Sequence, residues 1–402
     1  MTTKPLSIAI FGNTNNYPLL LAIGLKELGH SVRLVVNRKE LLHRPESCYP
    51  NFLESYPNWI FDCSNITDED IAGETRALLP AIECLTKGVD LVLLNDSGVA
   101  LAGYLKAPHV ALLTGSDLTY YANFESLQIR TSMWDLEFKR SDEGQKYVQN
   151  FTNFIARQRD GILSAKLVTH AQRGLILDGD KLLNEIGVAD HRRLMIFFSN
   201  TIDLKTKPFA HNNCFTILNG SRIVYQKAKN TTRSDTDFKG TDILLKGFAI
   251  YCKNGGNGEL RLVRKGQDLE DAISLIADLG ITNRVRWLDE MSLSNFYKEM
   301  ASSDLVCDQF GTSFPGMVTA DAYALGRPVI SNFKNECLSQ RFSKPFPGFD
   351  AKTSEEVANY LTILEKNPNL LMKMGKESRE YAEMFLSPKN MAAQLLKKLS
   401  NL

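Results

Sequence analysis

The sequence predicts an α/β protein made of two domains, each a doubly wound parallel sheet. Three observations favour this fold class. The 402 residues are too many for one ordinary core and fit two domains of roughly 150–200 residues each. Short apolar segments alternate with amphipathic segments in both halves, which is the order of strands and helices around a parallel sheet. A polar stretch, residues 201–213, contains Pro208 and separates the two series.

The first domain opens with a strand–helix–strand unit. Residues 7–11 form a short apolar strand, the turn 12–16 follows, and an amphipathic helix is expected over about residues 17–28. Gly29 ends this helix before the next strand at 32–36. The rest of the domain is expected to contain strands at 90–94, 109–113, 166–169 and 194–198, and a helix over 97–105 with Ser97 as its N-cap.

The second domain repeats the alternation. Strands are expected at 214–218, 259–263, 285–288, 305–309 and 328–331, and helices at 242–251, 269–279, 293–300 and 317–325. Residues 354–402 are expected to be almost wholly helical. Because open parallel sheets bind ligands at the carboxyl ends of their strands, two facing sheets would form a cleft with a site on each wall.

Composition excludes several classes of protein. Lys plus Arg (47) nearly cancels Asp plus Glu (46), which argues against a general nucleic-acid binder. No apolar run approaches the roughly 20 residues of a spanning helix, and the first residues lead directly into a strand pattern. We therefore expect a cytoplasmic protein without a cleavable signal peptide. The seven cysteines are scattered, and neither they nor the six histidines show metal-ligand spacing, so no metal site is expected.

The most informative stretch lies between residues 304 and 330. A strand ends near Gln309, and a glycine-containing loop opens a helix near Gly316. The free N–H groups and positive dipole end of such a helix would suit an anion. Asp321, one turn later, could accept hydrogen bonds from ribose hydroxyls. An acidic residue in an ordinary surface helix remains the alternative reading.

Two basic residues in the same half form a second candidate group. Arg222 follows a strand, and Lys239 with Gly240 immediately precedes a helix. Both could reach a diphosphate, arginine through its planar fork of donors and lysine as a point charge. Solvated loop residues are the alternative. No GxSxG nucleophile elbow and no Walker A sequence is present.

The ordered series of these segments resembles the C-terminal domain of the retaining GT-B glycosyltransferases of family 4. The resemblance covers residues 216–332, and the first strand–helix–strand unit and Gly115-Ser116-Asp117 are similar to N-terminal features of that family. It implies the GT-B fold, two Rossmann-like doubly wound domains facing a cleft. It is carried by Gly220 to Arg222, Lys239 and Gly240, Arg264 to Gly266, Arg284 to Leu288, and Gly316 to Val329.

The resemblance also implies roles for individual residues. Arg222 and Lys239 would hold the donor diphosphate and act with Asp117 as the catalytic group. The loop residues Gly12, Asn13 and Asn16 would face the transferred sugar or the acceptor. The nucleobase, ribose, phosphate and sugar of the donor would be contacted by Arg286, Ser313, Phe314, Gly316, Met317, Val318 and Asp321.

The resemblance divides the chain into three parts. Residues 1–205 would form the acceptor domain, residues 206–385 the donor domain, and residues 386–402 a helix that returns to the first domain. The implied activity is metal-independent transfer of a sugar from a nucleoside diphosphate sugar, with retention of configuration and no other cofactor. The acceptor would be a glycan, a lipid-linked molecule or a protein.

The chain departs from the family pattern at its paired glutamates, where Ser313 replaces the first and Asp321 the second. A GT-B protein that only binds a nucleotide or glycan therefore stays open. A GT-B nucleotide-sugar epimerase is a further alternative, although no set of acid and base residues marks one. No nucleic-acid partner is expected. Peripheral membrane association stays open, with only the pair Lys397 and Lys398 near the C-terminal end in its favour.

Overall fold

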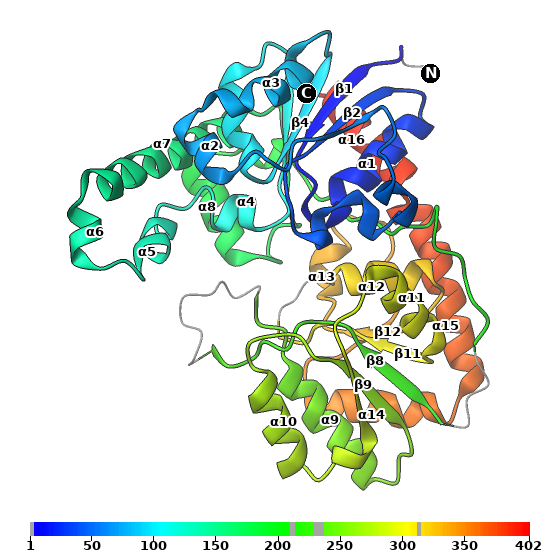
Figure 1. Cartoon of the computed structure of the whole chain (residues 1–402). Coiled ribbons are helices and arrows are strands. Elements are labelled where there is room, and N and C mark those ends of the chain that lie inside the picture. The colour runs from blue at the N-terminus through cyan, green and yellow to red at the C-terminus, as the bar shows by residue number, and fades with distance from the viewer. Residues whose placement is uncertain (1–3, 210–213, 228–236, 312–314) are drawn as a thin grey trace. The chain divides into compact units, whose positions relative to one another are not determined.

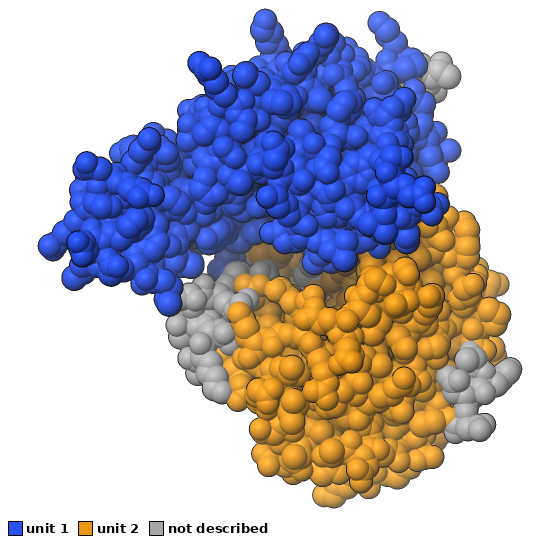
Figure 2. Space-filling model, in the orientation of Figure 1, with its two compact units in different colours: residues 1–171, 177–196, 388–402 blue, residues 172–176, 197–387 orange. Residues whose placement is uncertain are grey.

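The computed structural model describes residues 4–209, 214–227, 237–311 and 315–402 (Figure 1). The chain divides into two compact units (Figure 2). Unit 1 comprises residues 1–171, 177–196 and 388–402, and unit 2 comprises residues 172–176 and 197–387. Each unit is built around a sheet of its own.

Unit 1 contains a seven-stranded parallel sheet with the strand order β3-β2-β1-β4-β5-β6-β7. The order reverses between β1 and β4, so the carboxyl ends of these two strands lie side by side, which is where doubly wound sheets bind ligands. The strands are β1 (Ser7–Phe11), β2 (Ser31–Val36), β3 (Ile60–Asp62), β4 (Leu91–Asn95), β5 (His109–Leu112), β6 (Leu167–Thr169) and β7 (Arg193–Leu194).

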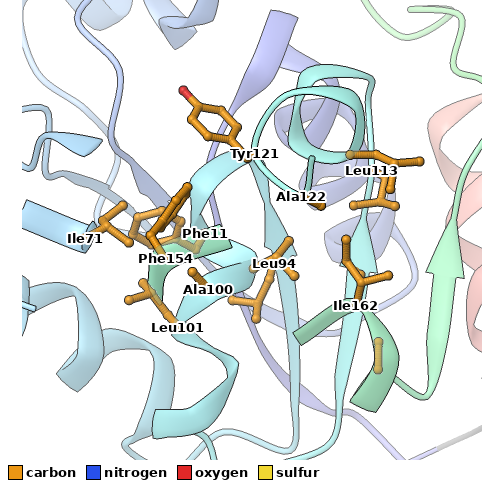
Figure 3. Packing of buried hydrophobic residues seen from close by; sticks show 14 of the residues in the cluster. Phe11, Ile71, Leu94, Ala100, Leu101, Leu113, Tyr121, Ala122, Phe154 and Ile162 are labelled. Atoms are coloured by element: carbon orange, nitrogen blue, oxygen red, sulfur yellow. The ribbon is translucent and has the colours of Figure 1, made fainter. Parts of the chain in front are cut away.

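Helices pack on this sheet and complete its core. Apolar side chains from β1 and β4, including Phe11 and Leu94, join Phe154 and Ile162 of the long helix α7 in one buried cluster (Figure 3). The helices of unit 1 are α1 (Tyr17–Glu27), α2 (Asp68–Gly73), α3 (Leu79–Thr86), α4 (Ser116–Thr119), α5 (Ser126–Thr131), α6 (Leu136–Arg140), α7 (Asp142–Ser164), α8 (Leu177–Ile186) and α16 (Pro388–Ser400).

The segment after β4 differs from the sequence prediction. Residues Asp96–Tyr104 form a 3-10 helix, and its N-cap is Asn95 instead of Ser97. Asp96 has a left-handed backbone (φ 61°) and Gly98 lies against the ring of Phe11, where a Cβ atom would approach within 2.0 Å. The chain therefore follows the surface of the core closely, which sequence periodicity does not reveal.

Unit 2 contains a six-stranded parallel sheet with the order β10-β9-β8-β11-β12-β13. Here the order reverses between β8 and β11. The strands are β8 (Thr216–Asn219), β9 (Glu259–Val263), β10 (Val285–Leu288), β11 (Leu305–Cys307), β12 (Val329–Ser331) and β13 (Phe349–Asp350). The helices are α9 (Thr241–Lys253), α10 (Leu269–Asp278), α11 (Leu293–Ser302), α12 (Met317–Ala324), α13 (Asn335–Leu338), α14 (Ser354–Glu365) and α15 (Pro368–Tyr381).

The last helix of the chain, α16, packs on the first helix, α1, within unit 1 (Figure 1). The two backbones touch at Gly24, where a Cβ atom would stand 2.2 Å from the carbonyl oxygen of Pro388. Only glycine allows this approach. Among the helices described, none is both long and apolar enough to cross a bilayer.

Candidate functional site

The carboxyl ends of β8 and β11 are tied together at the switch point of the unit 2 sheet. Asn219 ends β8, and its Nδ2 donates to the backbone carbonyls of Cys307 (3.3 Å) and Asp308 (3.0 Å). The chain turns away at Gly220, where a Cβ atom would lie 2.3 Å from the ring of Phe296. The loop that carries Arg222 therefore starts at the edge where a ligand is expected.

Lys239 is fixed against the loop that follows β11. Its carbonyl oxygen accepts from the N–H groups of Phe310 (2.7 Å) and Gly311 (3.1 Å). A Cβ atom on Gly240 would lie 2.3 Å from the nitrogen of Gly311, and one on Gly311 would lie 2.7 Å from the nitrogen of Gly240. Because two glycines face each other, the two loops pack backbone against backbone and set the position of Lys239.

Arg222 and Lys239 lie within electrostatic reach of each other. The half-exposed Arg222 guanidinium pairs with Asp237 at 3.5 Å. Burial and the neighbouring Arg222 charge lower the pKa of Lys239 to about 8, while Asp308 and Asp237 act in the opposite direction. Two adjacent cations favour an anion between or beside them, because each destabilises the charged form of the other. The structure thus brings together the two basic residues that the sequence predicts.

The start of α12 is occupied in part by a carboxylate that the sequence analysis did not single out. Asp308 Oδ2 accepts from the N–H of Gly316 (2.6 Å) and from the N–H and hydroxyl of Thr319 (3.3 and 2.7 Å). Its Oδ1 accepts from the hydroxyl of Ser221 (2.7 Å). Gly316 is thus held by an internal anion. The sequence signal that could have identified Asp308 is an acidic residue directly after a buried strand.

Two amides in the first turn of α12 remain open. Within the described ranges, the N–H groups of Met317 and Val318 have no hydrogen-bond acceptor, and both residues are partly exposed. Free N–H groups at a helix start suit a phosphate or hydroxyl ligand. Ser313 and Phe314, the other predicted contacts of this loop, lie outside the described residues.

Asp321 lies on the buried face of α12 and is only 6% exposed. Burial raises its pKa to about 8, with Asp308 adding to the rise and a hydrogen bond from Tyr297 opposing it. The surface-helix alternative for Asp321 is therefore wrong, since surface carboxylates remain solvated. A ribose contact stays a prediction.

The predicted nucleobase residue Arg286 lies in β10 with its side chain exposed. Its strand pairs in register with β9, opposite Arg261. At the carboxyl ends of these strands the Arg264 guanidinium stacks over Trp287 at 5.2 Å, and Lys265 pairs with Glu290 at 3.0 Å. Arg286 is thus separated along its strand from the end that meets the loops of Arg222 and Lys239.

The predicted loop of unit 1 uses its amide side chains for its own structure. Asn13 is fully buried, and its Oδ1 accepts from Leu19 N–H (3.0 Å) while its Nδ2 donates to Asn16 Oδ1 (2.7 Å). Asn16 Nδ2 donates to Ser47 Oγ (2.8 Å). Gly12 has φ 90° and lies against Asn95, whose carbonyl oxygen would be 2.7 Å from an added Cβ. These residues shape the switch point of unit 1.

Asp117 is also buried and bonds to its own turn. Its carboxylate accepts from the N–H of Thr114 (2.8 and 2.9 Å), the N–H of Gly115 (2.8 Å) and Asn95 Nδ2 (3.1 Å). Burial raises its pKa to about 6, against the effect of these backbone donors. These hydrogen bonds show that Asp117 orders the Thr114–Gly115 turn. Its catalytic role stays a prediction.

Sequence reasoning missed one further residue at this edge of unit 1, His43. Its Nδ1 accepts from Asn15 N–H (2.9 Å), which leaves a neutral ring with the proton on Nε2. Burial lowers the pKa of His43, which also favours the neutral ring. No sequence spacing marked it. Among the residues that the structure describes, no group of three or more His, Cys, Asp or Glu side chains could hold a metal ion.

Comparison with known proteins gives one family match and a set of structural relatives. Residues 233–381 match the family model described as glycosyl transferases group 1. HepE of Anabaena, in complex with UDP and glucose, has a TM-score of 0.60 at 16% identity over 99% of this chain and 100% of its own. TarM of S. aureus has a TM-score of 0.56 at 10% identity over 98% and 99% of the two chains. The fold is GT-B.

The curated relative is a glycosyltransferase of Haemophilus influenzae described as uncharacterized. It is 26% identical over 185 residues, which is 44% of this chain and 52% of that protein. The chain therefore matches about half the length of this relative. The family match lies wholly within unit 2, which also contains Arg222, Lys239 and the open amides of α12.

Proposed function

We propose that the protein is a glycosyltransferase that moves a sugar from a nucleoside diphosphate sugar to a glycan, lipid-linked or protein acceptor. One observation carries this proposal: Arg222 lies within electrostatic reach of Lys239, and Asp308 ties Ser221, the neighbour of Arg222, to Gly316 at the start of α12, where the amides of Met317 and Val318 are open. The site combines positive charge and free N–H donors, which is the chemistry that binds a diphosphate. HepE, which has the same fold, is described in complex with UDP and with UDP-glucose, which favours a uridine donor.

The proposed chemistry follows from where charge develops. The bond between the anomeric carbon and the diphosphate oxygen breaks, and the electron pair leaves with the diphosphate. Arg222 and Lys239 would stabilise that negative charge, which is the kind of preorganised electrostatic effect that lowers such barriers most. The acceptor hydroxyl forms the new bond, and its proton passes to the departing phosphate on the same face, with retention of configuration. Because side chains supply the positive charge, we propose that transfer needs no metal.

The donor domain is proposed as residues 206–385 and the acceptor domain as residues 1–205 with the helix in 386–402. Within the donor domain, Arg222 and Lys239 would contact the diphosphate, Met317 and Val318 would donate backbone N–H groups, and Asp321 would accept from the ribose. In the acceptor domain, Asp117 and Asn13 would act by holding their loops in shape. We propose a cytoplasmic enzyme.

A nucleotide-binding protein without activity is the second candidate. Ser313 favours it, because the family pattern that the chain resembles has a glutamate there. Turnover separates the two candidates. Acceptor-dependent release of free nucleotide from a sugar nucleotide requires a transferase, and stable binding without any turnover would favour the second candidate.

The first experiment is a thermal-shift series with UDP, GDP, ADP and CMP, with and without Mg²⁺. A nucleotide at about a hundred times its Kd would stabilise the protein by about 2.7 kcal/mol, a readable shift. Arg222→Ala and Lys239→Ala should each weaken binding by about 10- to 100-fold, because each removes a hydrogen bond to a charged group.

The matched control is Lys246→Ala, which removes an exposed lysine of α9 that pairs with Asp242 at 3.1 Å. It should bind nucleotide as the wild type does. Equal affinity in wild type, Arg222→Ala and Lys239→Ala would remove the basis of the proposed diphosphate site.

A further inference from the structure

Asp308 occupies a position that the proposed reaction does not explain. It follows β11, is 2% exposed, and takes four hydrogen bonds, from Gly316, from the N–H and hydroxyl of Thr319, and from Ser221. A buried carboxylate costs free energy unless it is paired and hydrogen-bonded. Here the donors include two backbone amides at the positive end of α12, which stabilise an anion.

These bonds join the three chain segments that form the donor site. Ser221 immediately precedes Arg222 in the loop after β8, Asp308 directly follows β11, and Gly316 is the N-cap of α12. Asp308 accepts from the amides of Gly316 and Thr319, and the amides of Met317 and Val318 between them have no acceptor among the described residues. Its carboxylate therefore decides which amides of the helix start a ligand can reach.

Asp308 also acts on Lys239 through charge. Among the residues that the structure describes, Arg222 disfavours the protonated form of Lys239, while Asp308 and Asp237 favour it. Asp237 also forms an ion pair with Arg222. Asp308 is the buried member of this group, where electrostatic interactions are less screened by solvent.

We propose that Asp308 is a positioning residue of the donor site, which orients the start of α12 so that Met317 and Val318 can bind the donor and which places a buried negative charge in the surroundings of Lys239. This inference rests on the proposed function. It assigns to an acidic residue a supporting role in binding an anionic ligand, because the Asp308 carboxylate is buried and bonds to donors of the chain itself.

The test measures UDP affinity by calorimetry at pH 6.5 and pH 8.5. Asp308→Asn keeps the size and shape of the side chain and removes the charge. Its NH2 group cannot accept the hydrogen bonds that one carboxylate oxygen accepts, so the ratio of affinities at the two pH values, and not the affinity alone, reports the loss of charge. The loss of affinity between the two pH values should be at least about threefold greater than in the wild type, because Lys239 loses its proton at lower pH. In a Lys239→Met background, Asp308→Asn should leave the pH ratio unchanged, which assigns the effect to this pair and not to Asp321.

The orienting role has a separate readout. Ser221→Ala and Thr319→Val each remove one hydroxyl donor to Asp308 and keep its charge. Each should weaken UDP binding by about threefold to tenfold at both pH values, with the pH ratio unchanged. If Asp308→Asn destabilises the fold too far to be measured, these two variants still test this part of the proposal.

The matched control lies at the other end of the same strand. Asp304 precedes β11, and its carboxylate accepts from the N–H and hydroxyl of Thr216, both at 2.8 Å. Asp304→Asn should leave the affinity and the pH ratio as in the wild type. Equal pH ratios in Asp308→Asn and Asp304→Asn, with wild-type affinity in Ser221→Ala and Thr319→Val, would overturn the inference. Failure of the wild type to bind any of the four nucleotides would instead overturn the proposed function.

Discussion

Arg222 and Lys239 hold two positive charges close together at the end of a sheet, and burial adds to the cost of charging Lys239. Without a bound anion, the repulsion between the two cations raises the free energy of the protonated form of Lys239. The anion relieves the repulsion and favours the protonated form of Lys239. Under the proposed function, binding of a diphosphate would therefore be coupled to uptake of a proton.

This coupling predicts how nucleotide affinity depends on pH. Below about pH 8, Lys239 is protonated in both the free and the bound protein, and affinity is at its maximum. As the pH rises through 8, the free protein loses the proton and binding must recover it. UDP affinity should fall by roughly five- to tenfold between pH 7.5 and pH 9.

Calorimetry in two buffers of different ionisation enthalpy would measure this proton uptake at pH 8.5. Lys239→Met should abolish most of it. An affinity that is flat from pH 7.5 to pH 9 would show that Lys239 does not contact the bound anion.

At the residue scale, sequence analysis found the residues whose type alone is informative. Arg222, Lys239 and Gly316 are brought to one edge of the unit 2 sheet. Asp308 was missed because its role depends on donors from residues 221, 316 and 319, which no spacing in the sequence connects. Asn13 was assigned to a ligand, but folding places its amide inside the loop.

At the scale of elements, the proposed donor site depends on two loops that touch through glycines. Gly311 and Gly240 face each other, and the same contact fixes the carbonyl of Lys239. This contact is set by the absence of a Cβ atom on each loop.

Gly311→Ala should therefore damage the site and the fold together. The new Cβ would stand 2.7 Å from the backbone oxygen of Phe238 and from the nitrogen of Gly240, so one loop must move. We expect a loss of about 1–3 kcal/mol in the free energy of unfolding and a weaker UDP affinity, measured by chemical denaturation and calorimetry.

Gly247→Ala is the matched control for this variant. Its Cβ would meet Ser354 and Val357 at the contact between α9 and α14, away from Lys239. It should lower stability by a similar amount and keep UDP affinity. A Gly311→Ala protein with wild-type affinity would show that the loop contact does not position Lys239.

Most strands and helices could be predicted, because buried parallel strands read as short apolar runs and their covering helices as amphipathic segments. β1 and β9 have the predicted bounds. Asp96–Tyr104 could not be predicted as a 3-10 helix, because its path is set by contact of Gly98 with Phe11, a residue of another strand.

At the scale of the whole molecule, the two ends of the chain meet in unit 1. α16 packs on α1 through the close approach of Gly24 and Pro388. The GT-B fold class could be predicted from the alternation of elements in both halves and from the family resemblance. The contact at Gly24 could not, because an interior glycine in a helix looks unfavourable until its partner is known.

Gly24→Ala should destabilise unit 1 without affecting the donor site. The added Cβ would collide with the backbone of Pro388 and Lys389, which cannot rotate away as a side chain can. We expect a loss of about 1–3 kcal/mol in the free energy of unfolding, seen as a lower Tm.

Gly103→Ala is the control in the same unit, since no atom lies within 4 Å of its added Cβ. It should leave the Tm within error of the wild type. UDP affinity should be unchanged in both variants, because Arg222 and Lys239 belong to unit 2. A Gly24→Ala protein with wild-type Tm would show that α16 packs more loosely than its backbone contact implies.

The docking of α16 on α1 has a consequence for synthesis on the ribosome. Unit 1 is begun first and completed last, because residues 197–387 of unit 2 emerge before Pro388–Ser400. α1 ends at Glu27 and α16 begins at Pro388, so at about 5–20 residues per second the surface of α1 that receives α16 stays uncovered for roughly 20–70 s. During that interval the nascent chain exposes apolar surface that chaperones can bind, and unit 2 can finish folding before its neighbour does.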